Sequence, residues 1–179
     1  EGDPSSWLKF AYGLKARLTM HTIYRATDKN TAYQTIIDCC DKSFQSMDEQ
    51  AAYNPYDANN LNPLFDFEWS RDGIAVSKSL YEKFAERNDP RMNRIYFSSG
   101  NWNHVMPSDD DFLPVPNGEG LELQYYYTYD CFVFAQTAPT YLLSYHEVQF
   151  LKAEALARLG KEEAAKDCVL NAIKAAFAN

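Results

Sequence analysis

Two short motifs contain residues that could bind a zinc ion or a nucleotide. His146-Glu147 matches the start of the His-Glu-x-x-His pattern, in which two histidines one helical turn apart bind zinc and the glutamate acts as a general base. Position 150 is Phe, so the second zinc ligand is missing. Gly118-x-Gly120 lacks the third glycine of a dinucleotide-binding loop, because position 123 is Leu. We therefore expect neither zinc nor a cofactor.

The chain carries 25 Asp and Glu residues, which could supply a calcium site or a pair of catalytic carboxylates. Asp57-Ala58-Asn59 begins like a calcium loop, but Leu61 stands at the fifth position and Asn62 at the place of the turn glycine. The run Asp109–Asp111 is typical of a solvated loop. No pair of carboxylates stands out by its spacing. We expect no metal site and no enzyme; a calcium ion and a glycoside hydrolase with unrecognised carboxylates are the less favoured alternatives.

Aromatic side chains are the remaining source of binding chemistry, since 15% of the residues are Phe, Trp or Tyr. A ring in an exposed loop can stack on a flat, partly apolar ligand such as the C–H face of a sugar. The alternative for each ring is that it anchors its own loop to the protein. Trp7 falls on the apolar face of a predicted helix and is expected in the core. The candidate ligand-binding rings are Tyr53, Tyr56, Trp69, Trp102 and Tyr125.

Two helical hairpins are predicted to position these loops. Asp3-Pro4 supplies an N-cap and a proline at the first helical position, and apolar residues at helical spacing follow to about Ile23. A second helix runs to about Gln45, which gives a hairpin at about 4–45. Helix-like spacing of small and apolar residues recurs at about 144–177, where Ser144 and Glu147 form a capping box. Gly160 stands where this second hairpin turns.

The stretch between the hairpins is predicted to be mostly irregular. Residues 53–73 contain many turn dipeptides and read as a long loop rich in rings. Ser79 and Glu82 predict a short helix that Asn88-Asp89-Pro90 ends. Residues 95–97 predict a short strand and residues 121–135 an extended segment. The expected fold is therefore mainly α, a TPR-like α-α superhelix with long irregular loops and a few short strands.

Composition excludes several classes of protein. The net charge of −8 and the absence of a basic cluster make a nucleic-acid partner unfavourable. No apolar run is long enough to cross a membrane. With 179 residues, 46% of them hydrophobic, the chain can build one sizeable core. The four cysteines are expected as small core residues, with one disulfide in an exported protein as the alternative; they are Cys39, Cys40, Cys131 and Cys168.

Four segments, met in order along the chain, resemble one family. Trp7-Leu-Lys-Phe-Ala-Tyr-Gly-Leu-Lys-Ala-Arg-Leu18 is similar to its first helix, and Asp89-Pro90-Arg91 is similar to its Asp-Pro-Arg turn. Residues 139–160, with the core Ala153-Glu-Ala155, resemble its most distinctive helix, and Ala172-Ile-Lys-Ala-Ala-Phe177 resembles its Gly-Ile-x-Ala-Ser-Phe ending. The family is that of the SusD/RagB-like outer-membrane nutrient-binding lipoproteins.

The resemblance implies a surface protein of Bacteroidetes-type bacteria, held to the outer membrane by an N-terminal lipid anchor that this chain does not contain. It implies non-catalytic binding of glycans or other nutrients for delivery to a SusC-like TonB-dependent transporter. Members are longer, so residues 1–179 are expected to be a single SusD-like domain from a longer chain. No ligand residue transfers by motif. The alternative is a TPR-type adaptor that binds peptides, which two hairpins and an acidic chain disfavour.

Overall fold

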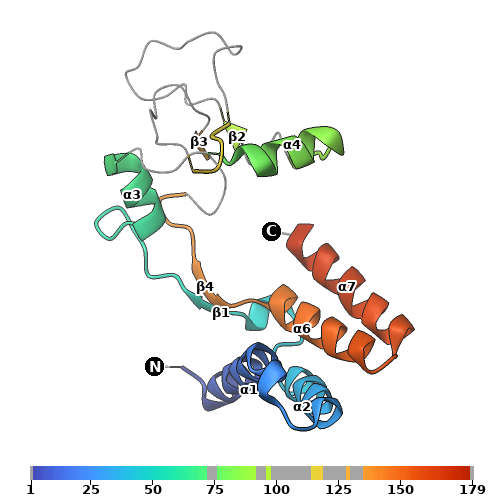
Figure 1. Ribbon diagram of the computed structural model, residues 1–179. Coiled ribbons are helices and arrows are strands. Elements are labelled where there is room, and N and C mark those ends of the chain that lie inside the picture. Colours follow the sequence, from blue (N-terminus) through green and yellow to red (C-terminus); the bar gives the residue numbers. More distant parts are fainter. Residues whose placement is uncertain are drawn as a thin grey trace. The chain divides into compact units, whose positions relative to one another are not determined.

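The chain is mainly helical, as predicted, in the computed structural model shown in Figure 1. The structure describes residues 2–71, 76–91, 96–97, 114–118, 128–129 and 135–177. The chain divides into two compact units. The first combines Glu1–Tyr53 with Tyr141–Asn179, and the second is Asn54–Thr140.

Four helices build the first unit: α1 (Pro4–His21), α2 (Lys29–Asp41), α6 (Tyr145–Arg158) and α7 (Glu162–Phe177). Helix α1 packs on α2, α2 packs on α6, and α6 packs on α7 (Figure 1). Two hairpins that are far apart in the sequence are therefore joined through the contact of α2 with α6. This arrangement confirms the mainly α, TPR-like fold class.

Local sequence signals explain where these helices start. The Asp3 carboxylate accepts a hydrogen bond from the Ser5 backbone N–H, and Pro4 follows it at the first helical position. The Asp28 carboxylate caps α2 by accepting from the N–H groups of Asn30 and Thr31. Helix α2 ends at Asp41, four residues before the predicted end. The short helix η1 (Ile23–Arg25) takes up the connection between α1 and α2.

The second hairpin turns at Gly160, as predicted. Gly160 has φ +73°, a backbone conformation that glycine adopts without strain. Its N–H donates to Ala157 O at 3.0 Å, and the Lys161 N–H donates to Leu156 O at 2.9 Å. These two bonds are the Schellman pattern of a helix C-terminus. Gly160 therefore ends α6 and lets α7 return along it.

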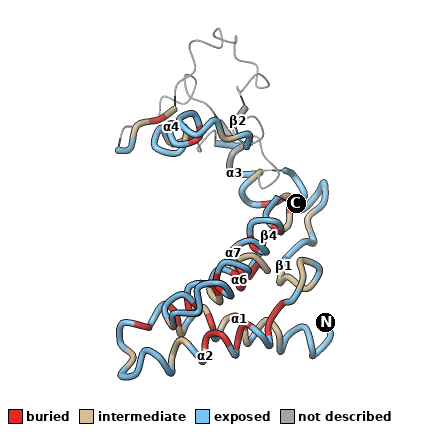
Figure 2. Tube along the Cα trace, turned by 90° about the vertical axis from the view of Figure 1, so that its right-hand side faces the viewer, coloured by how far each residue is buried: buried red, intermediate tan, exposed pale blue. Residues whose placement is uncertain are grey.

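One buried cluster runs through all four helices (Figure 2). Small residues of α7, Ala165 and Cys168, let this helix approach α6 closely. Cys39, Cys40 and Cys168 are buried free thiols, which confirms the core prediction for these three; Cys131 lies outside the described residues. Burial raises the pKa of the Cys40 thiol to about 12.

Gly13 allows α1 to approach the end of strand β4 (Thr140–Leu143), which pairs with β1 (Ala51–Tyr53). A Cβ at position 13 would lie 2.3 Å from Leu143 Cδ2 and 2.6 Å from Ser43 Oγ. Both side chains are buried, so neither can swing aside. A larger residue at position 13 would overpack this contact.

The predicted capping box at the start of α6 forms only in part. Ser144 Oγ accepts from the Glu147 N–H at 3.2 Å, as expected. The Glu147 carboxylate, however, binds Arg17 of α1, with Nε to Oε1 at 2.5 Å and Nη2 to Oε2 at 2.6 Å. Arg17 also donates to Leu142 O at 2.9 Å. A bidentate, half-buried pair is stronger than the local cap, and it ties α1 to α6.

In the second unit, the long loop predicted over 53–73 is wrong in part, because Pro63–Arg71 forms helix α3. Asn62 Oδ1 accepts from the N–H groups of Leu64 and Phe65 at 2.8 and 3.3 Å. Asn62-Pro63, a turn dipeptide in the sequence, thus acts as an N-cap followed by proline at the first helical position. Asn62 is buried, and its amide donates to Ala138 O at 2.7 Å.

Helix α4 (Lys78–Glu86) is the predicted short helix, with Ser77 rather than Ser79 at its N-cap. It ends as predicted, with Asn88 in the left-handed region at φ +48°. Phe84 of α4 is buried, as are Val76 just before the helix and Val115, whose backbone pairs with Ser77. The predicted short strand is confirmed as β2 (Tyr96–Phe97), which pairs antiparallel with β3 (Thr128–Tyr129).

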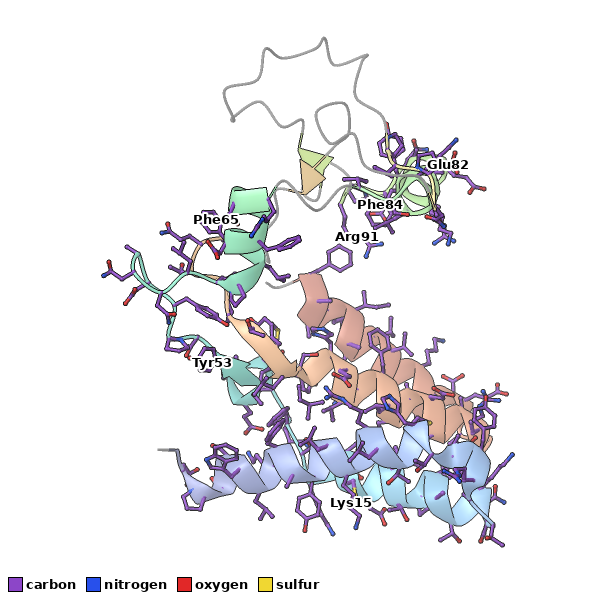
Figure 3. All side chains as sticks on the ribbon, turned by 60° about the vertical axis from the view of Figure 1, so that its left-hand side comes forward. Lys15, Tyr53, Phe65, Glu82, Phe84 and Arg91 are labelled. Carbon is purple, nitrogen blue, oxygen red and sulfur yellow. The ribbon has the colours of Figure 1, made fainter. Side chains whose placement is uncertain are left out.

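The Asp-Pro-Arg turn after α4 contains a close ion pair. Arg91 donates to both oxygens of Asp89, from Nε at 2.9 Å and from Nη2 at 2.6 Å, and its guanidinium lies 4.9 Å from the Phe84 ring centroid (Figure 3). The hydrogen bonds from the Arg91 side chain and backbone N–H lower the pKa of Asp89 to about 2. A carboxylate in an unfolded chain has a pKa near 3.9.

We expect the Asp89–Arg91 pair to contribute stability above about pH 4 and to lose it as the pH falls through the folded-state pKa of about 2. The pair stabilises the folded state at the higher pH because the pKa of Asp89 is lower in the folded chain than in the unfolded chain. A ¹³C-carboxyl NMR titration measures the pKa of Asp89 directly. The variant Arg91→Gln should raise that pKa toward the ordinary value. An Asp89 that titrates near 3.9 in the unsubstituted protein would contradict this prediction.

Candidate functional site

The structure describes the side chains of two of the five candidate rings. Tyr53 ends β1 and is exposed (Figure 3). Tyr56 is half-buried, and its hydroxyl lies 2.9 Å from Thr140 Oγ1, so it anchors its own loop. Trp69 lies in α3 rather than in a loop, and its side chain is outside the described part of the chain, as are Trp102 and Tyr125. These five residues stay predictions.

A pocket of about 210 Å³ opens on the first unit, where the start of α1 faces the segment after α2. Its walls are mostly apolar, with three polar residues among them. Of the lining residues, Glu49 belongs to the short helix η2 (Met47–Glu49), two alanines belong to strand β1, and Leu142 belongs to strand β4. The lining residues are Ser6, Trp7, Phe10, Phe44, Glu49, Gln50, Ala51, Ala52 and Leu142.

Trp7 was expected in the core, and this expectation is wrong. Its side chain is 63% exposed and lines the pocket. Helical periodicity placed Trp7 on the same face as Phe10, but the described residues leave most of Trp7 uncovered. The two rings meet edge to face, with centroids 6.2 Å apart and planes inclined by 65°. Phe10 packs against the core, so it supports the exposed indole from below.

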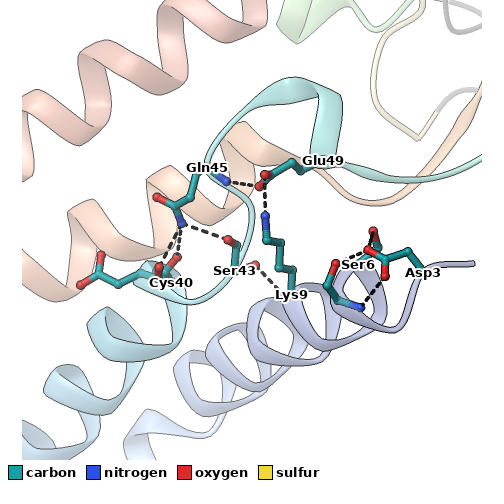
Figure 4. A network of polar contacts seen from close by, with 9 residues as sticks. Asp3, Ser6, Lys9, Cys40, Ser43, Gln45 and Glu49 are labelled. Atoms are coloured by element: carbon teal, nitrogen blue, oxygen red, sulfur yellow. Dashed lines mark hydrogen bonds and ion pairs between the residues drawn. The ribbon is translucent and has the colours of Figure 1, made fainter.

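A network of hydrogen bonds fixes the segment that forms the pocket floor (Figure 4). Gln45 Nε2 donates to the carbonyl oxygens of Cys40 and Asp41 at 3.1 and 3.2 Å, and so satisfies the C-terminal end of α2. Ser43 Oγ donates to Lys9 O at 3.0 Å, which ties this segment to α1. Phe44 lies between these contacts, buried beneath the pocket.

The charges at the pocket are paired. Lys9 Nζ lies 2.5 Å from Glu49 Oε1, and the Gln45 backbone N–H donates to Glu49 Oε2 at 2.8 Å. The hydrogen bond from Lys9, with that from Gln45, lowers the pKa of the Glu49 carboxyl, so Glu49 is ionised at neutral pH. Gln50 Oε1 accepts from the Tyr145 N–H at 3.1 Å, which orients its amide.

This arrangement suits the binding of a small ligand group. An exposed indole, an apolar floor and a few oriented polar groups can hold a ligand that has both a flat apolar face and hydroxyl groups. Across the described residues, no group of three or more His, Cys, Asp or Glu side chains is placed to hold a metal ion. Within the same part of the chain, no helix is both long and apolar enough to cross a membrane.

Comparison with protein families gives a match over the whole sequence. The sequence model of the SusD-like_2 family, described as starch-binding and associating with the outer membrane, matches residues 1–179. The chain belongs to the SusD-like family. The resemblance seen in the four short segments of the sequence is thereby confirmed, and so is the TPR-like fold that it implied.

Solved structures, among them members of this family, have the same fold. A SusD/RagB family protein from Bacteroides thetaiotaomicron is 45% identical, and the match covers 97% of this chain and 37% of that one with a TM-score of 0.85. A SusD homologue from Bacteroides vulgatus is 24% identical over 97% of this chain and 35% of that one, with a TM-score of 0.72. A chitin-binding protein is 20% identical over 97% and 40%, with a TM-score of 0.68.

The SusD-like chain described here spans well under half the length of these three proteins. No curated protein matches it. The two relatives below 25% identity support the fold alone. The ligand and the partners of the whole protein are therefore proposals.

Proposed function

We propose that this SusD-like chain belongs to a non-catalytic protein of the outer-membrane surface that binds glycans. The observation that carries the proposal is the match of all 179 residues to a family described as starch-binding. The pocket beside Trp7 supports glycan binding, because that pocket offers an aromatic surface.

We also propose where the bound glycan goes and how the protein is attached to the membrane. The bound glycan is delivered to a SusC-like TonB-dependent transporter, and the protein is held to the membrane by an N-terminal lipid. Both compact units belong to one SusD-like domain. These steps rest on the family alone.

Affinity electrophoresis and calorimetry on the full-length protein, with starch and a panel of other polysaccharides, test the proposal. We expect retention by at least one glycan and no release of reducing sugar. Failure to bind any glycan in the panel, with protein shown to be folded by circular dichroism, would overturn glycan binding. Release of reducing sugar would overturn the non-catalytic role.

The ring-bearing residues predicted from the sequence give a second test. Trp69→Ala and Trp102→Ala should each weaken glycan affinity by about 1–3 kcal/mol if these rings stack on the ligand. Tyr24→Ala serves as the matched control, because Tyr24 is an exposed ring that is not among the candidates. Unchanged affinity in both tryptophan variants would mean that neither ring contacts the ligand.

A further inference from the structure

The indole of Trp7 packs edge to face on Phe10 and is otherwise largely uncovered by the described residues. Trp7 stands on the apolar face of α1, yet the residue is 63% exposed, and it borders a pocket whose lining is mostly apolar. Exposed rings beside apolar pockets are typical of binding sites. We propose that this pocket binds one neutral sugar ring of a glycan, stacked on the Trp7 indole. The inference rests on the proposed function for the class of ligand and adds a site to it.

The size of the pocket sets the size of the group it can hold. Pockets for drug-sized ligands have about 300–1,000 Å³. The volume of about 210 Å³ is smaller, and it suits a single ring of a longer molecule that continues into solvent. Ser6 and Trp7, in the first turn of α1, both line the pocket. At this size, a glycan chain can occupy the pocket with one terminal or branching unit.

The polar groups of the pocket match sugar hydroxyls, which both donate and accept hydrogen bonds. Gln50 is oriented by its bond to the Tyr145 N–H through Oε1, and its amide nitrogen is a donor of known direction. The Ser6 hydroxyl can donate or accept. Glu49 adds carboxylate oxygens that accept. The pocket thus offers apolar surface for the C–H face of a sugar and polar groups for its hydroxyls.

The charges favour a neutral sugar over an acidic one. Lys9 is paired with Glu49 at 2.5 Å, so its cation is already neutralised. The lining itself contains one carboxylate and no Lys or Arg. A uronic acid would bring a second carboxylate to Glu49, and like charges at close range are unfavourable. The net charge of −8 adds to this repulsion.

Calorimetry on the full-length protein with maltotriose as the neutral probe and trigalacturonic acid as the acidic probe tests the inference. We expect Trp7→Ala to weaken maltotriose binding by about tenfold or more, because an aromatic platform contributes more than 1.4 kcal/mol. Trp7→Phe keeps a ring and should retain affinity to within a few-fold. Leu8→Ala is the matched control, since Leu8 is exposed on the same helix but does not line the pocket.

The outcomes separate the inference from the proposed function. If the unsubstituted protein binds maltotriose and Trp7→Ala binds it equally well, the pocket is not the site, while glycan binding stands. If the unsubstituted protein binds no glycan, the proposed function fails and the inference fails with it. Glu49→Gln supplies an independent test of the charge argument. It releases Lys9 and should shift preference toward trigalacturonic acid; an unchanged preference would overturn the specificity for neutral sugars.

Discussion

Phe44→Ala is expected to lower the free energy of unfolding of the first unit by about 3–5 kcal/mol. Phe44 is only 1% exposed and belongs to the cluster that joins the four helices. Its ring also forms the floor of the pocket beside Trp7. Truncation removes a large buried apolar surface and leaves a cavity that the helices cannot close, because Gln45 and Ser43 hold the backbone on either side.

Urea unfolding followed by far-ultraviolet circular dichroism measures this effect. Phe150→Ala is the matched control, since Phe150 is 44% exposed in α6 and its truncation should cost much less. Phe44→Leu keeps most of the apolar volume and should fall between the two. A Phe44→Ala variant as stable as the Phe150→Ala variant would show that the ring does not support the core.

Asn62→Ala is expected to destabilise the second unit by about 2–4 kcal/mol, from two sources. Loss of the N-cap of α3 costs about 1 kcal/mol. Loss of the amide leaves Ala138 O without the donor that reaches it at 2.7 Å, and an unsatisfied buried acceptor costs about 1–3 kcal/mol. Asn62 is 2% exposed, so water does not readily replace either bond.

Hydrogen exchange at the amides of Leu64 and Phe65 reports on this prediction locally, because both donate to Asn62 Oδ1. Asn62→Asp keeps an acceptor for these amides but removes the donor to Ala138 and buries a charge, so it should not restore stability. Asn59→Ala is the control, since the Asn59 side chain is exposed. Equal protection of the two amides in Asn62→Ala and the unsubstituted protein would contradict the role of Asn62.

Helix ends were predicted best where the signal is local. Asp3-Pro4 and Ser144 each cap a helix through backbone groups two or three residues away, so neighbouring residues contain the whole interaction. Gly160 was predicted for the same reason, since the turn depends on its own backbone conformation. Asn62-Pro63 is a similar local signal for the start of α3. The sequence alone predicts a turn there, because this dipeptide also occurs in turns. In the structure, Asn62 is buried and caps the helix.

The candidate site was predicted less well than the fold. The aromatic content predicts a binding surface. The sequence, however, favours rings in loops as the binding residues, and the helical spacing of Trp7 predicts a place in the core. A helical period identifies the face on which a residue lies and not how far the neighbouring helices extend along that face. The polar groups of the pocket had no sequence signal, because Glu49 and Gln50 act through Lys9 and Tyr145, 40 and 95 residues away in the chain.

The sequence by itself determined the class of protein, the two hairpins and the exclusion of most enzymatic motifs, because these depend on composition and on contacts within a helical turn. Only the tertiary structure decided how the hairpins join and where a ligand pocket opens. Arg17 and Glu147 illustrate the reason. They are 130 residues apart in the chain, and their pairing exists only because α1 and α6 pack side by side. The exposure of Trp7 likewise depends on which parts of the fold reach the start of α1, which helical periodicity does not specify.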